Sequence, residues 1–296
     1  MSGAGPLAAG DHVRVVAPAG PVDTDLLDAG MALLRDWDLD VSVAPHVTAT
    51  HRLGYLAGGD ADRAADLAQA WCDPQVAAVF CARGGYGSQR VLPHLDWAAL
   101  ADAAPKPLVG SSDVTALHHE FAAHLGVPTV FGPMVASEAF AKDKSAQQSL
   151  HRALFQPTTS VVVSGPDAGP LVGGRVRGIT AGGTASLLAA LAGASTPPPP
   201  GCVLLLEDVG ESPYRLDRIV TQLLAAGWLR EVAGIALGSF TRCGSDTEVW
   251  AVLADRLMGL GVPVAWGLTF GHCRGQATIR LGAPAVLDAD AGELTI

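Results

Sequence analysis

Residues 108–115 read Leu-Val-Gly-Ser-Ser-Asp-Val-Thr and pass from an apolar run, through small residues, into a helical pattern. A serine in such a turn lies at the carboxyl edge of a sheet, with its hydroxyl exposed. The first N–H groups of the following helix point toward the same space and can stabilise an oxyanion. The segment therefore fits a nucleophile. The alternative is that Ser111, Ser112 and Asp113 only cap the helix.

Residues 81–90, Cys-Ala-Arg-Gly-Gly-Tyr-Gly-Ser-Gln-Arg, follow a strongly apolar run and open a helix. Consecutive glycines after a parallel strand allow backbone N–H groups to approach a ligand closely. The spacing differs from a dinucleotide-binding fingerprint, because Arg90 stands where the third glycine belongs, and no Gly-Lys-Ser/Thr is present. An anion or oxyanion site and a tight turn without a ligand both remain open.

The second half of the chain supplies an acid pair and a glycine-flanked histidine. Glu207 and Asp208 end an apolar strand, and His272 lies in the loop Phe-Gly-His-Cys-Arg-Gly. Acids at a strand end are often only solvated, and most histidines are structural. Taken together, however, the segments supply a nucleophile, a base, an orienting acid and an oxyanion loop.

The elements that position these residues alternate in the first half of the chain. Apolar runs predict strands, and repeats at three-to-four spacing predict helices after them. Alternation of this kind indicates βαβ units, a parallel sheet and right-handed crossovers. The predicted strands are 12–17, 41–44, 76–82, 107–110 and 127–131, and the predicted helices begin at Asp23 or Thr24, at Asp60 and at Asp113.

The second half is less regular and predicts a smaller, β-rich domain. We expect helices at 185–191 and 214–226, strands at 203–206, 235–240 and 278–281, and two more strands within 285–296. A stretch rich in Pro, Gly, Ser and Thr at 156–170 divides the chain into domains 1–155 and 171–296. Residues 195–201, with four consecutive prolines, are the rival boundary or a tight loop.

Composition excludes several classes of protein. The chain has 296 residues, 49% of them hydrophobic, and a formal charge of −10. A nucleic-acid backbone requires a surplus of Lys and Arg, and an acidic membrane surface is equally unsuitable. Five scattered cysteines include no C-x-x-C pair, so we expect reduced thiols and no zinc site. No targeting segment or membrane span is visible, so the expected location is cytoplasmic.

Several short motifs in a fixed order give the chain a family resemblance. It resembles the LD-carboxypeptidases (muramoyltetrapeptide carboxypeptidases), whose relatives include the microcin C self-immunity peptidases. The resemblance runs along nearly the whole chain. The motifs are Val15-Val-Ala-Pro18, Gly54-Tyr-Leu-Ala-Gly58, Arg63, Arg83-Gly-Gly-Tyr-Gly87, Gly110-Ser-Ser-Asp113, Gly132-Pro-Met134, Gly182-Gly183, Leu206-Glu-Asp208, Tyr214-Arg-Leu-Asp-Arg218 and Gly271-His272.

The resemblance assigns roles to individual residues. It makes Ser112, not Ser111, the nucleophile, Glu207 the acid and His272 the base. The oxyanion hole that it implies consists of the backbone N–H groups of Gly85 and Asp113. Arg83 and Gly84 are candidate substrate contacts. The fold that it implies is α/β, with a parallel-sheet Rossmann- or flavodoxin-like N-terminal domain and a smaller β-rich C-terminal domain.

The implied reaction is hydrolysis of the L,D amide bond that releases terminal D-alanine from murein tetrapeptides, as in peptidoglycan recycling and cell-wall metabolism. It requires no metal or cofactor. One alternative is a microcin C-like immunity peptidase acting on a peptidyl-nucleotide. Only Phe140 and Phe155 could offer an aromatic platform within 132–170, which favours murein peptides. Another alternative is a small-ligand-binding α/β protein without chemistry.

Two departures from the family pattern concern substrate contacts. Ala19 stands where serine is common, and Thr184 stands where asparagine is usual. We expect a homodimer. The sequence does not determine whether diaminopimelate or lysine is preferred at the third peptide position.

Overall fold

Strands that alternate with amphipathic helices build the first of two units in the computed structural model, which describes residues 5–296. The units are Met1–Thr159 and Ser160–Ile296. The strands of the first unit are all mutually parallel and run in the order β5-β4-β3-β1-β2. They are β1 (His12–Val16), β2 (Asp40–Val43), β3 (Ala78–Cys81), β4 (Leu108–Gly110) and β5 (Thr129–Phe131).

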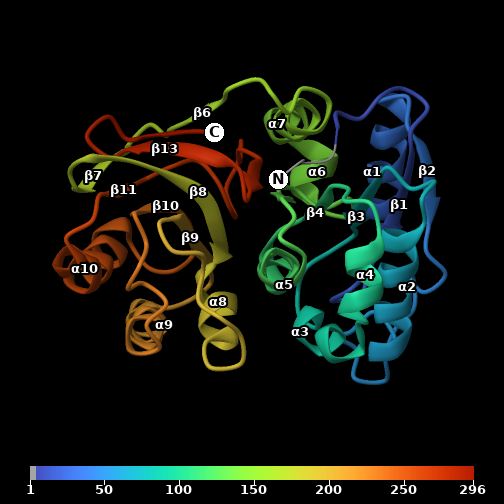
Figure 1. Ribbon diagram of the computed structural model, residues 1–296, viewed down its shortest axis with the longest axis horizontal. Coiled ribbons are helices and arrows are strands. Elements are labelled where there is room, and N and C mark those ends of the chain that lie inside the picture. Colours follow the sequence, from blue (N-terminus) through green and yellow to red (C-terminus); the bar gives the residue numbers. More distant parts are fainter. Residues whose placement is uncertain (1–4) are drawn as a thin grey trace. The chain divides into compact units, whose positions relative to one another are not determined.

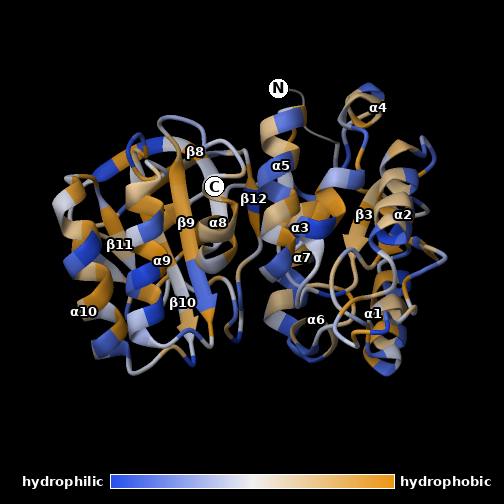
Figure 2. Cartoon of the chain, turned by 90° about the horizontal axis from the view of Figure 1, so that it is seen from below, coloured by the Kyte–Doolittle hydropathy of each residue, from blue (hydrophilic) through white to orange (hydrophobic). Residues whose placement is uncertain are grey.

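Two groups of helices flank this sheet (Figure 2). One group consists of α1 (Thr24–Asp36), α6 (Glu138–Lys142) and α7 (Lys144–Phe155). The other consists of α2 (Asp60–Cys72), α3 (Ser88–Val91), α4 (Trp97–Asp102) and α5 (Thr115–Leu125), with the short 3-10 turns η1 (Leu92–His94) and η2 (Ser112–Val114). Because helices cover both faces, the central strand β3 is apolar and all four of its residues are buried.

The strand order places a topological switch point between β1 and β3. Chain connections leave these two neighbouring strands in opposite directions across the sheet, so their loops separate at the carboxyl edge. The loop after β1 begins at Ala17, and the loop after β3 contains Gly84 and Gly85. The parallel α/β fold predicted for the first unit is confirmed.

A mixed sheet organises the second unit, in the order β6-β14-β13-β8-β9-β10-β11-β7. The four strands β8 to β11 are mutually parallel, and the outer pairs are antiparallel. The strands are β6 (Val162–Val163), β7 (Gly169–Val172), β8 (Arg175–Thr184), β9 (Val203–Val209), β10 (Gly234–Thr241), β11 (Val264–Trp266), β13 (Pro284–Asp288) and β14 (Glu293–Thr295). The short strand β12 (Ile279–Leu281) contacts β8.

The long strand β8 joins the two halves of this sheet. Its first five residues pair with β13 and its last five with β9, and Figure 1 shows the strand curving between these partners. Three helices lie side by side below β9 and β10 in Figure 1: α8 (Ala185–Leu191), α9 (Pro213–Ala225) and α10 (Asp246–Leu257), which the 3-10 turn η3 (Met258–Leu260) follows.

The structure differs from the sequence-based expectation in several places. The segment 156–170, interpreted as a linker, contains β6 and the start of β7, which pair with β14 and β11. The helix expected from Asp113 begins at Thr115, after the 3-10 turn. Helix α10 was not predicted.

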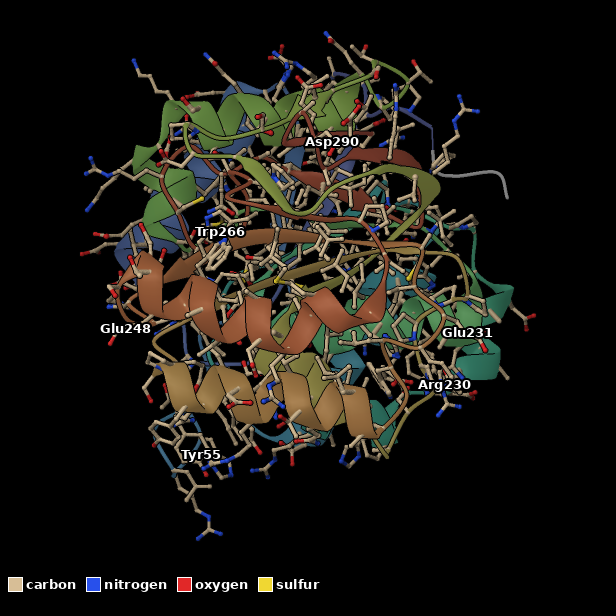
Figure 3. All side chains as sticks on the ribbon, turned by 90° about the vertical axis from the view of Figure 1, so that its left-hand side faces the viewer. Tyr55, Arg230, Glu231, Glu248, Trp266 and Asp290 are labelled. Carbon is tan, nitrogen blue, oxygen red and sulfur yellow. The ribbon has the colours of Figure 1, made fainter. Side chains whose placement is uncertain are left out.

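The start of α10 carries a capping box. The Ser245 hydroxyl accepts a hydrogen bond from the Glu248 N–H at 3.3 Å, and the Glu248 carboxylate accepts one from the Ser245 N–H at 2.9 Å. Figure 3 shows Glu248 at the beginning of this helix. Reciprocal bonds of this kind satisfy donors that a helix N-terminus otherwise leaves free.

Replacing Ser245 with alanine removes the side-chain acceptor of this box. We expect the Ser245→Ala variant to lose about 1 kcal/mol of unfolding free energy in urea denaturation. Ser245→Asp is the matched control, because aspartate also caps helices, and it should retain most of the stability. Equal losses in both variants would contradict the capping role.

Candidate active site

Ser112 occupies a strained turn between β4 and α5. Its φ angle is +57°, in the left-handed region that residues with a side chain rarely adopt. The preceding Ser111 is buried and has an extended backbone. A non-glycine residue held in this conformation costs on the order of 1 kcal/mol, and such residues concentrate at functional sites. The turn thus gives Ser112 and Ser111 different backbone geometries at the carboxyl edge of the sheet.

Gly84 lies directly against Ser112. A Cβ on Gly84 would lie 2.9 Å from the Ser112 Cβ and 3.2 Å from its Oγ, so a side chain there would displace the serine. The Gly84 carbonyl accepts a hydrogen bond from the Gly20 N–H at 2.9 Å, which joins the loops after β1 and β3. The sheet switch point and the serine turn therefore form one continuous site within the first unit.

Gly85 follows with a φ angle of +97°. Its N–H donates to no backbone acceptor within residues 5–296. A backbone N–H without an acceptor, one residue from the serine contact, has the chemistry required for binding an oxyanion. Arg83, on the other side of Gly84, is exposed and donates from Nη1 to the Pro21 carbonyl at 2.6 Å.

The helix-capping alternative for Ser111, Ser112 and Asp113 does not agree with this geometry. The residue that caps α5 is Val114, whose side chain makes no capping hydrogen bond. Ser111 makes no side-chain capping bond to η2 either. The Asp113 carboxylate instead accepts a hydrogen bond from the Ser88 N–H at 2.7 Å, at the start of α3.

Glu207 lies at the carboxyl end of β9 in the second unit. Figure 2 shows this strand as hydrophobic along most of its length and hydrophilic at its end. The Glu207 side chain is fully buried. It accepts three hydrogen bonds, from Thr184 Oγ1 at 2.5 Å, His272 N–H at 3.1 Å and His272 Nδ1 at 2.7 Å. A buried carboxylate requires this degree of pairing.

The loop that carries His272 depends on Gly271. Its φ angle is +89°, and a Cβ at this position would lie 2.4 Å from the Glu207 Oε2. Only glycine therefore lets the chain pass over the carboxylate. The backbone N–H and the ring Nδ1 of His272 can then both bond to the Glu207 carboxylate. The Thr241 hydroxyl, at the end of β10, fixes the loop further by donating to the His272 carbonyl at 2.5 Å.

The Glu207 contact determines the protonation of the His272 ring. A carboxylate only accepts hydrogen bonds, so Nδ1 carries the proton, and Nε2 keeps a lone pair in the neutral ring. Burial lowers the pKa of His272, but the hydrogen bond and the charge of Glu207, aided by Asp208, outweigh it and raise the pKa above its usual value. The ring is 27% exposed, so a substrate can reach it. This pair can accept a proton from a nucleophile.

Asp208 has different partners from its neighbour. Its carboxylate accepts from the Ser186 N–H at 2.8 Å and from the Ser186 hydroxyl at 3.2 Å, at the start of α8. Burial raises the pKa of Asp208 to about 6, against the opposing effect of its hydrogen bonds to backbone N–H groups. Successive strand residues face opposite sides, which is why only one of the two acids contacts His272.

The two departures from the family motifs occupy different places. Ala19 is buried in the first unit, and its carbonyl accepts a hydrogen bond from the Ala57 N–H at 3.0 Å. Thr184 ends β8 opposite Glu207 and holds the carboxylate through its hydroxyl. Sequence reasoning assigned Thr184 to substrate contact and did not identify this role. The pairing of neighbouring parallel strands is the signal that could have found it.

Residues 5–296 contain neither a candidate metal-binding cluster nor a candidate membrane-spanning helix. This part of the chain contains no group of three His, Cys, Asp or Glu side chains arranged to hold a metal ion. Within the same residues, no helix has the length and apolar character that crossing a bilayer requires.

Comparison with known proteins identifies the same two-part organisation. Residues 13–132 match the LD-carboxypeptidase N-terminal domain, and residues 177–287 match the LD-carboxypeptidase C-terminal domain. The chain is 54% identical over 294 residues to a protein of Streptomyces coelicolor, covering 98% of this chain and 94% of that one. It is 35% identical to the murein tetrapeptide carboxypeptidase of Pseudomonas aeruginosa, covering 94% of each chain.

Two solved structures share the fold of this chain. The muramoyltetrapeptide carboxypeptidase of Oxalobacter formigenes superimposes with a TM-score of 0.83 at 30% identity, covering 96% of this chain and 97% of that one. The microcin C7 self-immunity protein has a TM-score of 0.88 at 22% identity, covering 100% and 98%, a likeness of fold. With both domain matches and this level of identity, the chain belongs to the LD-carboxypeptidase family of serine peptidases.

Proposed function

We propose that this protein hydrolyses the L,D amide bond that releases terminal D-alanine from murein tetrapeptides, with Ser112, His272 and Glu207 as its catalytic triad. The observation that carries the proposal is the pairing of the buried Glu207 carboxylate with Nδ1 of His272, which leaves Nε2 of the ring as a base. The strained Ser112 turn beside Gly84 supports it independently. The similarity to the Pseudomonas aeruginosa enzyme supports the choice of murein tetrapeptide as the substrate.

In the proposed reaction, His272 Nε2 takes the proton of Ser112 as the serine oxygen attacks the carbonyl carbon. Glu207 holds the ring through Nδ1 and stabilises the cation that forms. The tetrahedral oxyanion is held by the N–H groups of Gly85 and Asp113. His272 then protonates the departing amine of D-alanine, and an acyl-enzyme on Ser112 remains.

Water hydrolyses the acyl-enzyme by the same path, with His272 again acting as the base. The proposal requires the two units to bring His272 Nε2 within hydrogen-bond reach of Ser112 Oγ, about 2.6–3.2 Å when substrate is bound. It needs no metal ion.

A purified enzyme assayed side by side on a murein tetrapeptide and a peptidyl-nucleotide should release D-alanine and leave the nucleotide intact. The reverse preference would overturn the substrate assignment.

The two neighbouring serines test the nucleophile. Ser112→Ala should lower kcat by roughly 10⁴- to 10⁶-fold, because the attacking oxygen is lost. Ser111→Ala is the matched control and should have a mild effect. The measurements are D-alanine release and covalent labelling by a fluorophosphonate. A larger loss for Ser111→Ala would move the nucleophile by one residue.

The acid limb of the pH profile tests Glu207. His272 must be neutral to accept a proton, so kcat/KM should rise with pH through its raised pKa, above 6.5. In Glu207→Gln the negative charge is absent, so the limb should move to lower pH while turnover falls roughly 10⁴-fold, as in other triads. An unchanged limb in the variant would exclude Glu207 as the partner of the base.

Asp208 should act on stability rather than on catalysis. The pKa of its carboxyl is raised from 3.8 to about 6 in the folded protein, so the native state binds the proton more tightly than the unfolded chain. Its contribution to stability therefore falls as pH rises from about 4 to 6. In Asp208→Asn this pH-dependent decline should disappear from urea denaturation curves, with most of the activity retained. A catalytic loss as large as that of Glu207→Gln, at unchanged stability, would contradict this.

A further inference from the structure

Two buried charged side chains hold one peptide group of the glycine loop. The Gly87 carbonyl accepts a hydrogen bond from Arg63 Nη1 at 2.9 Å, and the Ser88 N–H donates to Asp113 Oδ2 at 2.7 Å. These groups are the two ends of the same Gly87–Ser88 peptide. Arg63 is 1% exposed and Asp113 is 2% exposed. We call Arg63 and Asp113 the peptide clamp.

Arg63 also connects the clamp to the rest of the first unit. Its guanidinium, from α2, donates to the Pro18 carbonyl in the loop after β1 and to the Asp60 carboxylate. Gly87 has a φ angle of +135°, and a Cβ there would lie 2.7 Å from Arg63 Nη1. The glycine therefore lets the guanidinium approach the backbone closely.

Asp113 connects the clamp to the serine turn, because it directly follows Ser112. Burial raises the pKa of its carboxyl, and the hydrogen bond from Ser88 and the charge of Arg63 oppose this shift. A carboxylate at so buried a position is costly, and capping of its own helix, α5, does not account for it. The backbone of Asp113 belongs to the serine turn, whereas its side chain bonds to Ser88 in the glycine loop.

The segment between the two held points contains Gly85. On one side, the Gly84 carbonyl accepts from the Gly20 N–H at 2.9 Å. On the other side stands the clamped Gly87–Ser88 peptide. Gly85 and Gly87 both have positive φ angles, a conformation that glycine leaves as readily as it adopts. Without restraints at both ends, the direction of the Gly85 N–H would vary.

We infer that Arg63 and Asp113 are positioning residues for the oxyanion hole, fixing the glycine loop to the serine turn so that the Gly85 and Asp113 N–H groups converge on one point. The inference rests on the proposed function, which assigns the oxyanion to these two N–H groups. It differs from a role in stability alone, because it predicts a loss of transition-state stabilisation, which lowers kcat and leaves KM nearly unchanged.

The test compares kcat, KM and transition-state affinity in clamp variants. Asp113→Ala should lower kcat by about 10- to 100-fold with KM within about 3-fold, because a misdirected donor affects the transition state more than the bound substrate. Asp113→Asn keeps one acceptor oxygen and should recover most of this loss. Arg63→Gln should resemble Asp113→Ala, and Arg63→Lys should be intermediate.

Arg90→Gln is the matched control. The Arg90 side chain donates to the same Asp60 carboxylate, at 3.0 and 2.7 Å. Only its backbone N–H, which the substitution keeps, bonds to the Gly87 carbonyl, at 3.0 Å. This variant should keep kcat within about 2-fold of the wild type. Binding of a peptide aldehyde, which forms a tetrahedral adduct with the serine, should weaken in parallel with kcat across the clamp variants and remain unchanged in Arg90→Gln.

The outcomes separate the inference from the proposed function. If the wild type does not release D-alanine from murein tetrapeptide, the proposed substrate is wrong, and the rate of fluorophosphonate labelling at Ser112 still reports on the clamp. Unchanged labelling and unchanged kcat in Asp113→Ala and Arg63→Gln would overturn the inference. If these two variants do not fold, unchanged labelling and kcat in Arg63→Lys, for which an intermediate loss is expected, would overturn it. So would kcat losses that disappear after correction for the folded fraction, or an equal loss in Arg90→Gln.

Discussion

The buried carboxylate of Glu207 is the constraint on which the candidate site of the second unit depends. A charge without solvent contact must be compensated by its neighbours, because an unpaired ion costs several kcal/mol in such surroundings. Three donors supply this compensation, and they come from β8 and from the loop that carries His272. The position of His272 is therefore a result of satisfying Glu207, and Gly271 is required because any side chain would occupy the space of the carboxylate.

The two units use the same structural device separately. In each, parallel strands end in loops that carry the polar side chains, at the sheet edge where α/β proteins usually bind ligands. In the first unit, buried charges from Arg63 and Asp113 hold the backbone of these loops. In the second unit, hydroxyl groups of Thr184 and Thr241 hold the Glu207 carboxylate and the His272 carbonyl. Buried side chains, with the half-buried Thr241, thus hold the loops and the polar residues of each candidate site in place.

Much of the fold could be predicted from the sequence, because strands that are covered on both faces appear as continuous apolar runs. The strands ending before Pro18, Arg83 and Ser111 were identified within a few residues. Strand β8 was missed, because three glycines and two arginines conceal its period. Helix α10 was also missed, although the Ser245–Glu248 capping box marks its start.

The candidate site was less accessible to sequence reasoning. Short motifs identified Glu207 and His272 as candidates, since glycine-flanked histidines and strand-end acids are visible locally. The support of Thr184 and the contact of Asp113 with Ser88 depend on strand pairing and on hydrogen bonds between residues that are distant along the chain. No local pattern records such contacts. For the same reason, the sequence could not separate the capping alternative for Asp113 from its observed contact.

The backbone of Ser112 has a consequence for how this protein can evolve. The left-handed conformation is unfavourable for every residue with a side chain, and glycine alone adopts it without strain. A change to glycine would relax the turn and abolish the hydroxyl at the same time. Selection for folding alone therefore favours the loss of the proposed nucleophile, because a change to glycine at this position lowers the free energy of the turn. A serine that persists in such a turn is a sign that chemistry, not stability, has kept it there.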